Sequence, residues 1–206
     1  MNVGILGATG RVGSFLLKKA LKNGDQVQAL VRYSNKTFHS ENSVNWTIGD
    51  VLIKEDVLKV LSGTDVVFCA ISSGGLSTLS KCMPMIIESM KQHQIKRIVT
   101  IGTAGILQSR IEPELYRFQS SESRNRSTKA TEDHLHAYLL LKQSGLDWTI
   151  ICPTYLPDGE CAGHFRFERD YLPDNGRFIS PCDTAEFAYQ QLTSNDFLYC
   201  RVGLAY

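Results

Sequence analysis

The sequence predicts an α/β protein with a single doubly wound, mostly parallel sheet, helices on both faces and a small C-terminal cap. Three observations predict it. Short apolar runs alternate with helical patterns along most of the 206 residues. The run at 65–71 is apolar almost throughout, which is typical of a parallel strand buried on both faces. A strand-like run that begins at Val3 ends at Gly7, Gly10 and Gly13, and an amphipathic helix follows at once.

In the first half of the chain, local sequence patterns predict the bounds of each helix and strand. Asn23-Gly24 ends the first helix, because glycine readily adopts the backbone conformation that terminates helices. The segments 26–31 and 44–48 are expected to be strands, 51–61 a short helix and 65–71 the fourth strand.

In the second half, proline and capping residues define the helix boundaries. The helix at 80–93 contains Pro84, which a helix tolerates in its first turn, so this helix is expected to start near Lys81. The pattern Asp183-x-x-Glu186 is expected to cap the last helix. The remaining expected elements are strands at 95–101, 146–152 and 198–202 and helices at 127–144 and 183–192.

Two stretches interrupt the alternation. The polar stretch 104–126, with four arginines and a serine-rich run, is either a functional loop on the substrate side or a solvated surface excursion. The stretch 153–180 combines prolines, an Asn-Gly pair and spaced aromatic residues, and it predicts a small hairpin-like cap. Residues 1–206 together are expected to form one domain.

Composition restricts the partners and the compartment. The chain has 22 Lys and Arg against 21 Asp and Glu, so neither a nucleic acid nor an acidic membrane surface is an expected partner. We expect no signal peptide and no membrane span. The six cysteines form no C-x-x-C pair and no metal-like cluster, and Cys69 and Cys152 lie in apolar runs. This usage predicts a cytoplasmic protein without a metal site.

The glycine turn predicts a binding site for a dinucleotide. The free amides and the positive end of a helix face whatever occupies such a turn. Gly7 would permit the tight turn, Gly10 would let the backbone approach a pyrophosphate, and Gly13 would let the helix pack closely on the strand. A tight turn without a ligand is the alternative, but the position between strand and helix favours the site.

The end of the second strand predicts which nicotinamide cofactor is bound. A carboxylate at this place would bind both ribose hydroxyls of NAD, whereas an arginine suits the 2′-phosphate of NADP. The chain has no acid between Val27 and Lys36, and it offers Arg32, Ser34 and Lys36. A guanidinium can bind a phosphate bidentately, so NADP(H) is expected in preference to NAD(H), unless Arg32 is merely an exposed cation.

Other cofactor contacts are expected at the carboxyl ends of the strands, where open α/β sheets bind ligands. Asp50 and Val51 would lie at the adenine, and Ala70, Ile71 and Ser72 at the pyrophosphate and the nicotinamide ribose. The full expected set is Gly7, Thr9, Gly10, Arg11, Val12, Gly13, Arg32, Ser34, Asp50, Val51, Ala70, Ile71, Ser72, Pro153, Thr154 and Tyr155.

The candidate catalytic residues are Thr103, just past the fifth strand, and His134 in the long helix. His134 could equally be a packed or solvated histidine. Tyr138 and Lys142 spell Y-x-x-x-K, the acid and its partner in ordinary short-chain dehydrogenases. Because Ser144-Gly145 ends the helix almost immediately, the pair lies too far along to face a nicotinamide, and we interpret it as a decoy.

Four segments carry a family resemblance that covers essentially the whole chain. They resemble the atypical short-chain dehydrogenase/reductase group, which includes NmrA-like proteins and biliverdin-IXβ and flavin reductases. The resemblance implies a Rossmann fold that binds NAD(P). The segments are Gly7-Ala-Thr-Gly-Arg-Val-Gly13, Leu30-Val-Arg32, Gly49-Asp-Val51 and Ser144-Gly-Leu-Asp-Trp-Thr-Ile-Ile151 with Pro153.

The resemblance also implies positions for the reactive groups. In flavin reductase-like relatives the residue ten before the serine of Ser144-Gly-Leu lies by the cofactor, and here it is His134. The same register puts Ala130 where the ordinary family has its tyrosine acid. Thr103 stands where a serine would follow the fifth strand, which keeps a hydroxyl.

Two functions follow as hypotheses. The first is an NADPH-dependent reductase of a flat conjugated small molecule, such as a flavin, quinone or tetrapyrrole-like acceptor, which takes its proton from solvent. The second is a non-catalytic NADP(H) redox sensor of the NmrA-like type that acts through a partner protein. An epimerase or dehydratase with tightly held NAD is disfavoured by Arg32 and by the missing tyrosine–lysine pair. The sequence predicts no oligomeric state.

Overall fold

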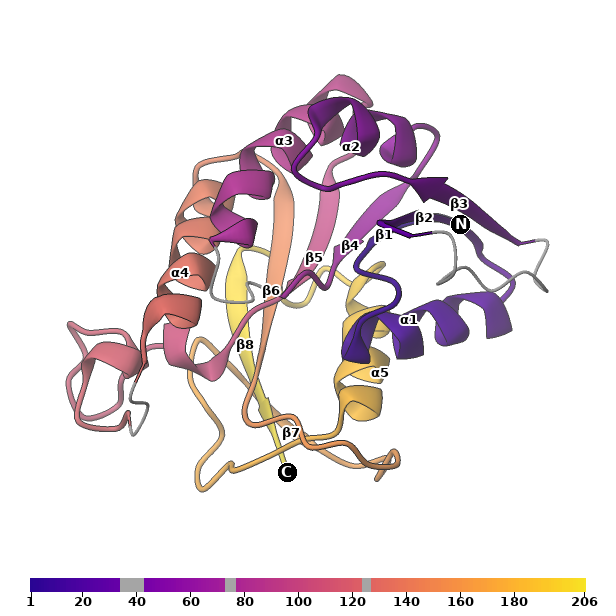
Figure 1. Cartoon of the computed structure of the whole chain (residues 1–206). Helices are drawn as coiled ribbons and strands as arrows, with labels where there is room; N and C mark the ends of the chain where they lie inside the picture. The colour runs from indigo at the N-terminus through magenta and orange to yellow at the C-terminus, as the bar shows by residue number, and fades with distance from the viewer. Residues whose placement is uncertain (34–42, 73–76, 124–126) are drawn as a thin grey trace.

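A computed structural model describes residues 1–33, 43–72, 77–123 and 127–206 (Figure 1). Within these residues eight strands form one sheet in the order β3-β2-β1-β4-β5-β6-β8-β7. All neighbouring pairs are parallel except β7 and β8, which are antiparallel. The strands are β1 Asn2–Leu6, β2 Gln26–Val31, β3 Val44–Ile48, β4 Val66–Cys69, β5 Arg97–Ile101, β6 Asp147–Pro153, β7 Arg166–Arg169 and β8 Cys200–Ala205.

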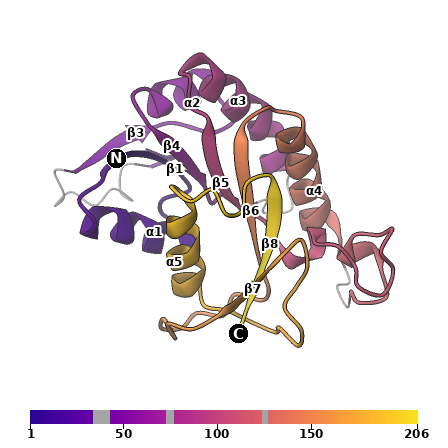
Figure 2. The same ribbon diagram turned by 180° about the vertical axis from the view of Figure 1, so that it is seen from behind.

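Helices cover both faces of the sheet. Helices α1 and α5 pack together on one face, and α2, α3 and α4 lie on the other, as Figures 1 and 2 show. Their bounds are α1 Arg11–Lys22, α2 Lys54–Leu61, α3 Thr78–Gln92, α4 Lys129–Lys142 and α5 Pro181–Gln191, and the short 3-10 helices are η2 Ala104–Ile106 and η3 Arg117–Gln119. The doubly wound fold expected from the sequence is confirmed.

The central strand β4 shows why a parallel strand is apolar throughout. Val67 and Cys69 belong to the core under α2, α3 and α4, whereas Val66 and Phe68 belong to the core under α1 and α5. Successive side chains of a strand point to opposite faces, so a strand covered on both sides buries each of them. Each fully buried aliphatic or aromatic side chain contributes about 1.5–3 kcal/mol.

The start of α3 differs from the sequence prediction. The helix begins at Thr78, so Pro84 lies inside it and not in its first turn. The carboxylate of Asp133 in α4 explains the earlier start, since it accepts hydrogen bonds from the backbone N–H groups of Leu79 and Ser80 at 3.0 and 2.9 Å. This cap comes from another helix, about fifty residues later in the chain, where a local pattern does not reveal it.

The C-terminal part also differs from the prediction. Ser180, and not Asp183, is the N-cap of α5: its hydroxyl accepts the N–H of Asp183 at 3.0 Å. The stretch 153–180 is not a separate hairpin-like cap, because its strand β7 joins the main sheet as an antiparallel edge strand beside β8. The last strand runs from Cys200 to Ala205, later than the expected 198–202.

The structure confirms the expected place of two cysteines and pairs two others, on which the sequence made no prediction. Cys69 and Cys152 are buried core residues, but Cys161 and Cys182 form a disulfide. This bridge removes one support for the expected cytoplasmic location. In the part of the chain that the structure describes, no helix is both long and apolar enough to cross a membrane.

Candidate functional site

The candidate site lies where the sheet order changes direction. Strand β1 is hydrogen-bonded to both β2 and β4, and the helices that follow β1 and β4, α1 and α3, cover opposite faces. The two connections therefore diverge at the carboxyl ends of these strands. Open α/β sheets bind their ligands in the crevice at such a point.

Three glycines shape the turn between β1 and α1. Gly7 has φ of +94°, and a Cβ on it would lie 2.7 Å from the carbonyl oxygen of Ala70 at the end of β4. A Cβ on Gly13 would lie 2.1 Å from the carbonyl oxygen of Gly7. The N–H of Gly10 donates to this same oxygen at 3.0 Å. Side chains larger than hydrogen are thus excluded at Gly7 and Gly13, and the backbone closes into a tight cradle.

The N-terminus of α1 is prepared for an anion. Gly10 is its N-cap without a side-chain hydrogen bond, and its first turn contains no acidic residue. The amides and the positive end of the helix dipole are therefore not used by a cap. The exposed Arg11 opens the helix, and its Nη1 donates to the carbonyl oxygen of Leu156 at 2.6 Å. The cradle and the uncapped helix fit a pyrophosphate.

The residues expected to select NADP(H) over NAD(H) lie at the end of β2. Arg32 follows β2 directly and is exposed, as is Tyr33. Ser34 and Lys36 lie outside the described residues. Asp50 follows β3, where its Oδ1 accepts the N–H of Leu52 at 2.9 Å. This carboxylate therefore stabilises its own loop, and its place at the adenine stays a prediction.

The other expected cofactor residues lie along the same edge. Thr9 and Val12 belong to the glycine turn and the first turn of α1, and Val51 is half-buried behind Asp50. The segment that follows β4 is half-buried at Ala70 and Ile71 and exposed at Ser72. Pro153, the last residue of β6, is buried. Past it, the N–H of Thr154 donates to the carbonyl oxygen of Leu204, and Tyr155 is 73% exposed.

Thr103 and His134 belong to two neighbouring elements, since Thr103 is the N-cap of η2 and His134 lies in α4. A Cβ on Gly105 would lie 2.6 Å from the Cγ2 atom of Thr131, so η2 packs directly on α4. Thr103 precedes this contact by two residues, and His134 lies one helical turn beyond Thr131 on the same face. The Thr103 hydroxyl accepts the N–H of Gly105 at a long 3.4 Å, which leaves its proton available to a ligand.

His134 is half-buried, and its partial removal from water favours the neutral imidazole. Removal from water lowers its pKa to about 4, although the neighbouring Asp133 carboxylate acts in the opposite direction. Asp133 itself is bound to the start of α3, which fixes the position of His134 between two helices. A neutral imidazole offers one donor and one acceptor nitrogen, and it can orient a ligand. With this pKa it is a poor proton donor at neutral pH.

Tyr138 of the Y-x-x-x-K motif is a packing residue. It is 7% exposed, and the ring of Trp148 contacts it edge-on at 5.7 Å between centroids. The guanidinium of Arg201 lies 4.9 Å from its ring centre. Lys142 is exposed in the last turn of α4. These contacts account for Tyr138 without a role in proton transfer.

Arg201 and Asp133 are two residues that sequence reasoning missed. Arg201 is 6% exposed on β8, where it donates to the carbonyl oxygen of Ile106 at 2.5 Å and pairs with Asp170 at 3.2 Å. It thereby joins the stretch 104–126 to Asp170 in the stretch 153–180. The sequence did carry one signal for Arg201: it is the only charged residue in an otherwise apolar last strand, and a buried charge needs polar partners.

These features match a known family along most of the chain. Residues 7–195 match the family described as NAD(P)H-binding. The chain belongs to the NAD(P)H-binding family. The expected family and the nicotinamide class of cofactor are thereby confirmed.

Solved structures cover nearly all of the chain. One is a proposed epimerase from Bacteroides thetaiotaomicron, 27% identical, with a TM-score of 0.86 over 100% of this chain and 96% of that one. A proposed NADH-flavin reductase from Streptococcus pneumoniae is 22% identical, with a TM-score of 0.83 over 100% and 99%. A short-chain dehydrogenase/reductase from Veillonella parvula, solved with NADP, is 16% identical, with a TM-score of 0.77 over 100% and 94%.

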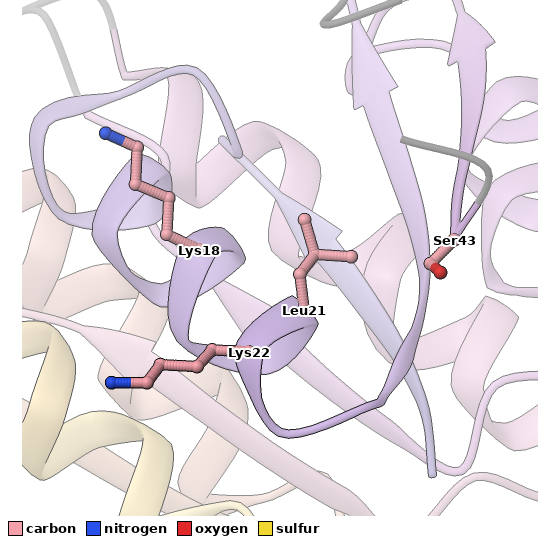
Figure 3. Close-up of a pocket in the computed structure, with 4 residues that line it drawn as sticks. All are labelled: Lys18, Leu21, Lys22 and Ser43. Atoms are coloured by element: carbon pink, nitrogen blue, oxygen red, sulfur yellow. The ribbon is translucent and has the colours of Figure 1, made fainter. Parts of the chain in front are cut away.

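A pocket of about 440 Å³ lies elsewhere in this NAD(P)H-binding protein (Figure 3). Leu21 points from α1 toward the strands, Lys18 and Lys22 extend away from them, and Ser43 immediately precedes β3. The pocket is therefore at the amino edge of the sheet. Ligands of such sheets bind at the opposite edge, so this pocket is not the cofactor site.

Proposed function

We propose that this protein is an NADPH-dependent reductase of a flat conjugated small molecule, such as a flavin, a quinone or a tetrapyrrole-like compound. A bound nicotinamide would supply the hydride. The glycine turn and the start of α1 would hold its pyrophosphate, and Thr103 and His134 would orient the reacting rings.

One observation supports the choice of acceptor: among the described residues, neither His134 nor Tyr138 is a ready proton donor. Burial keeps the pKa of His134 at about 4, and the alternative acid, Tyr138, is packed between Trp148 and Arg201. Reduction of a simple ketone needs an acid beside the developing alkoxide. A conjugated acceptor spreads the added charge over its rings and can take a proton from solvent. The available residues favour the second kind of substrate.

The preference for NADP(H) rests on Arg32. Its exposed guanidinium follows β2, at the place where a carboxylate would select NAD. Charge-assisted bidentate hydrogen bonds from an arginine would stabilise a 2′-phosphate. The same place offers no acid between Val27 and Tyr33.

A panel of acceptors tests the proposal. The purified protein is mixed with NADPH and, in turn, FMN, FAD, quinones and linear tetrapyrroles, and the loss of nicotinamide absorbance is followed. Enzyme-dependent oxidation with at least one acceptor is the expected result. Tight NADPH binding without turnover of any acceptor would favour the NADP(H) sensor instead. Failure to bind either nicotinamide nucleotide would contradict both functions.

A further inference from the structure

The disulfide lies in a segment that reaches the candidate cofactor site. Cys161 is exposed in the loop after β6, and Cys182 is half-buried in the first turn of α5. Their Cα atoms are 5.2 Å apart, within the usual range for bridged cysteines. The bridge therefore joins this loop to a helix that packs directly against α1.

This pair is the part of the cysteine set that solvent oxidants can reach. Cys69, Cys82, Cys152 and Cys200 are all buried. Burial raises the pKa of Cys152 to about 12 and that of Cys200 to about 11, so their reactive thiolates are scarce. Oxidation and thiol–disulfide exchange are therefore expected at Cys161 and Cys182.

Hydrogen bonds hold the loop beside α5 independently of the bridge. The Asp183 carboxylate accepts the N–H groups of Ala162 and Gly163 at 2.7 and 3.1 Å. Ala162 and Gly163 are the two residues after Cys161, and Asp183 directly follows Cys182. The two sulfur atoms therefore stay close when they are reduced, which permits the bond to form and break repeatedly.

The same loop binds Arg11, the first residue of α1. Leu156 accepts a hydrogen bond from Nη1 of Arg11 at 2.6 Å, and the Asp158 carboxylate lies 4.0 Å from this nitrogen. Arg11 directly follows Gly10, the N-cap of α1. In Figure 1 the orange loop after β6 runs below the lower end of α5. The loop thus connects the disulfide to the expected pyrophosphate site.

We propose that the Cys161–Cys182 pair is a reversible redox clasp that tightens NADP(H) binding when it is oxidised. The closed loop fixes the guanidinium of Arg11 through Leu156 and leaves further donors of that group for a phosphate. Fixing a flexible side chain in advance removes part of the entropy cost of binding. On reduction, the loop is held by hydrogen bonds alone and fixes Arg11 less firmly. This inference rests on NADP(H) binding at the glycine turn.

The redox step is a thiol–disulfide exchange. Closing the clasp joins the two sulfurs and releases two protons and two electrons. A small disulfide such as oxidised glutathione accepts them and becomes two thiols. Opening the clasp is the reverse reaction with reduced glutathione.

Measuring NADPH affinity in two redox states tests the inference. Wild-type protein is treated with oxidised glutathione or with a reducing agent, the state of Cys161 is verified by alkylation and mass spectrometry, and the Kd for NADPH is measured by calorimetry. We expect the Kd to be about threefold to tenfold lower in the oxidised protein, the range expected for one immobilised side chain. The double variant Cys161→Ser, Cys182→Ser should have the reduced-state Kd under both conditions.

Two further results complete the test. In Arg11→Gln the oxidised and reduced proteins should bind NADPH equally, because the residue that links loop and cofactor is gone. Equal Kd values for the two states of the wild type, or a pair that oxidised glutathione does not bridge, would overturn the clasp and leave the proposed function standing. Absence of NADPH binding in both states would overturn the proposed function together with the clasp.

Discussion

The buried carboxylate of Asp133 in α4 accepts the backbone N–H of Leu79, in the first turn of α3, at 3.0 Å. This bond joins the helix that carries His134 to the helix that follows β4. The position of a candidate catalytic residue is therefore set by a cap on a different helix.

Removing this cap is expected to destabilise the protein. Asp133→Ala leaves the amides of Leu79 and Ser80 without their acceptor, which should cost about 1–3 kcal/mol in the free energy of unfolding. Urea denaturation measures the loss. His136→Ala, an exposed position on the same helix, is the control and should change the free energy by less than about 0.5 kcal/mol. Equal losses in the two variants would contradict the capping role.

Protonation of His134 should oppose folding in mild acid. Its pKa is about 4 in the folded protein and about 6.5 in an unfolded chain, so the unfolded state binds more protons between these values. The stability contributed by neutral His134 is fully present above pH 6.5 and is lost as the pH falls toward 4. Urea denaturation across this range should show a shallower dependence on pH for His134→Gln than for the wild type. Identical slopes would show that burial does not lower this pKa.

The glycine cradle should not tolerate a methyl group. In Gly13→Ala the new Cβ would lie 2.1 Å from the Gly7 carbonyl oxygen, so the turn must move. We expect a loss of about 1–3 kcal/mol in the free energy of unfolding and at least about tenfold weaker NADPH binding. Gly159→Ala is the control, because its Cβ would have no atom within 4 Å. Normal NADPH affinity in Gly13→Ala would argue against binding at this turn.

The Y-x-x-x-K motif should be dispensable for turnover. Tyr138→Phe keeps the ring that packs against Trp148, and Lys142→Gln changes an exposed residue. The rate of NADPH oxidation in the double variant should stay within about twofold of the wild type, since loss of a general acid usually costs about 10²–10⁴-fold. A decrease in the rate of about 10²-fold or more would instead show that the motif takes part in catalysis.

Local patterns predicted most of the fold. Strands 26–31 and 44–48 have the expected bounds, because alternating and continuous apolar runs are determined by burial along the strand itself. Three features depend instead on residues far away in the chain. They are the start of α3, the disulfide partner of Cys161 and the hydrogen-bond partners of Arg201. Such tertiary contacts have no local periodicity, and they are the features that the sequence did not predict.

The same division holds for the candidate site. The glycine string has fixed spacing because the turn, the pyrophosphate approach and the helix packing each require it. The packing of η2 on α4 instead depends on the close approach of Gly105 and Thr131, which belong to distant parts of the chain. Sequence position suggested Thr103 and His134 separately, and it did not predict that η2, which Thr103 caps, packs on the helix of His134.

Arg32 is central to the proposed cofactor preference, and the ratio of two dissociation constants tests it most directly. Calorimetry with NADPH and NADH on the wild type and on Arg32→Asp gives this ratio for each protein. A charge-assisted contact with the 2′-phosphate should make the wild-type Kd for NADPH at least about tenfold lower than that for NADH. Arg32→Asp should abolish or reverse this preference. Equal wild-type affinities, or an unchanged ratio in Arg32→Asp, would contradict the account.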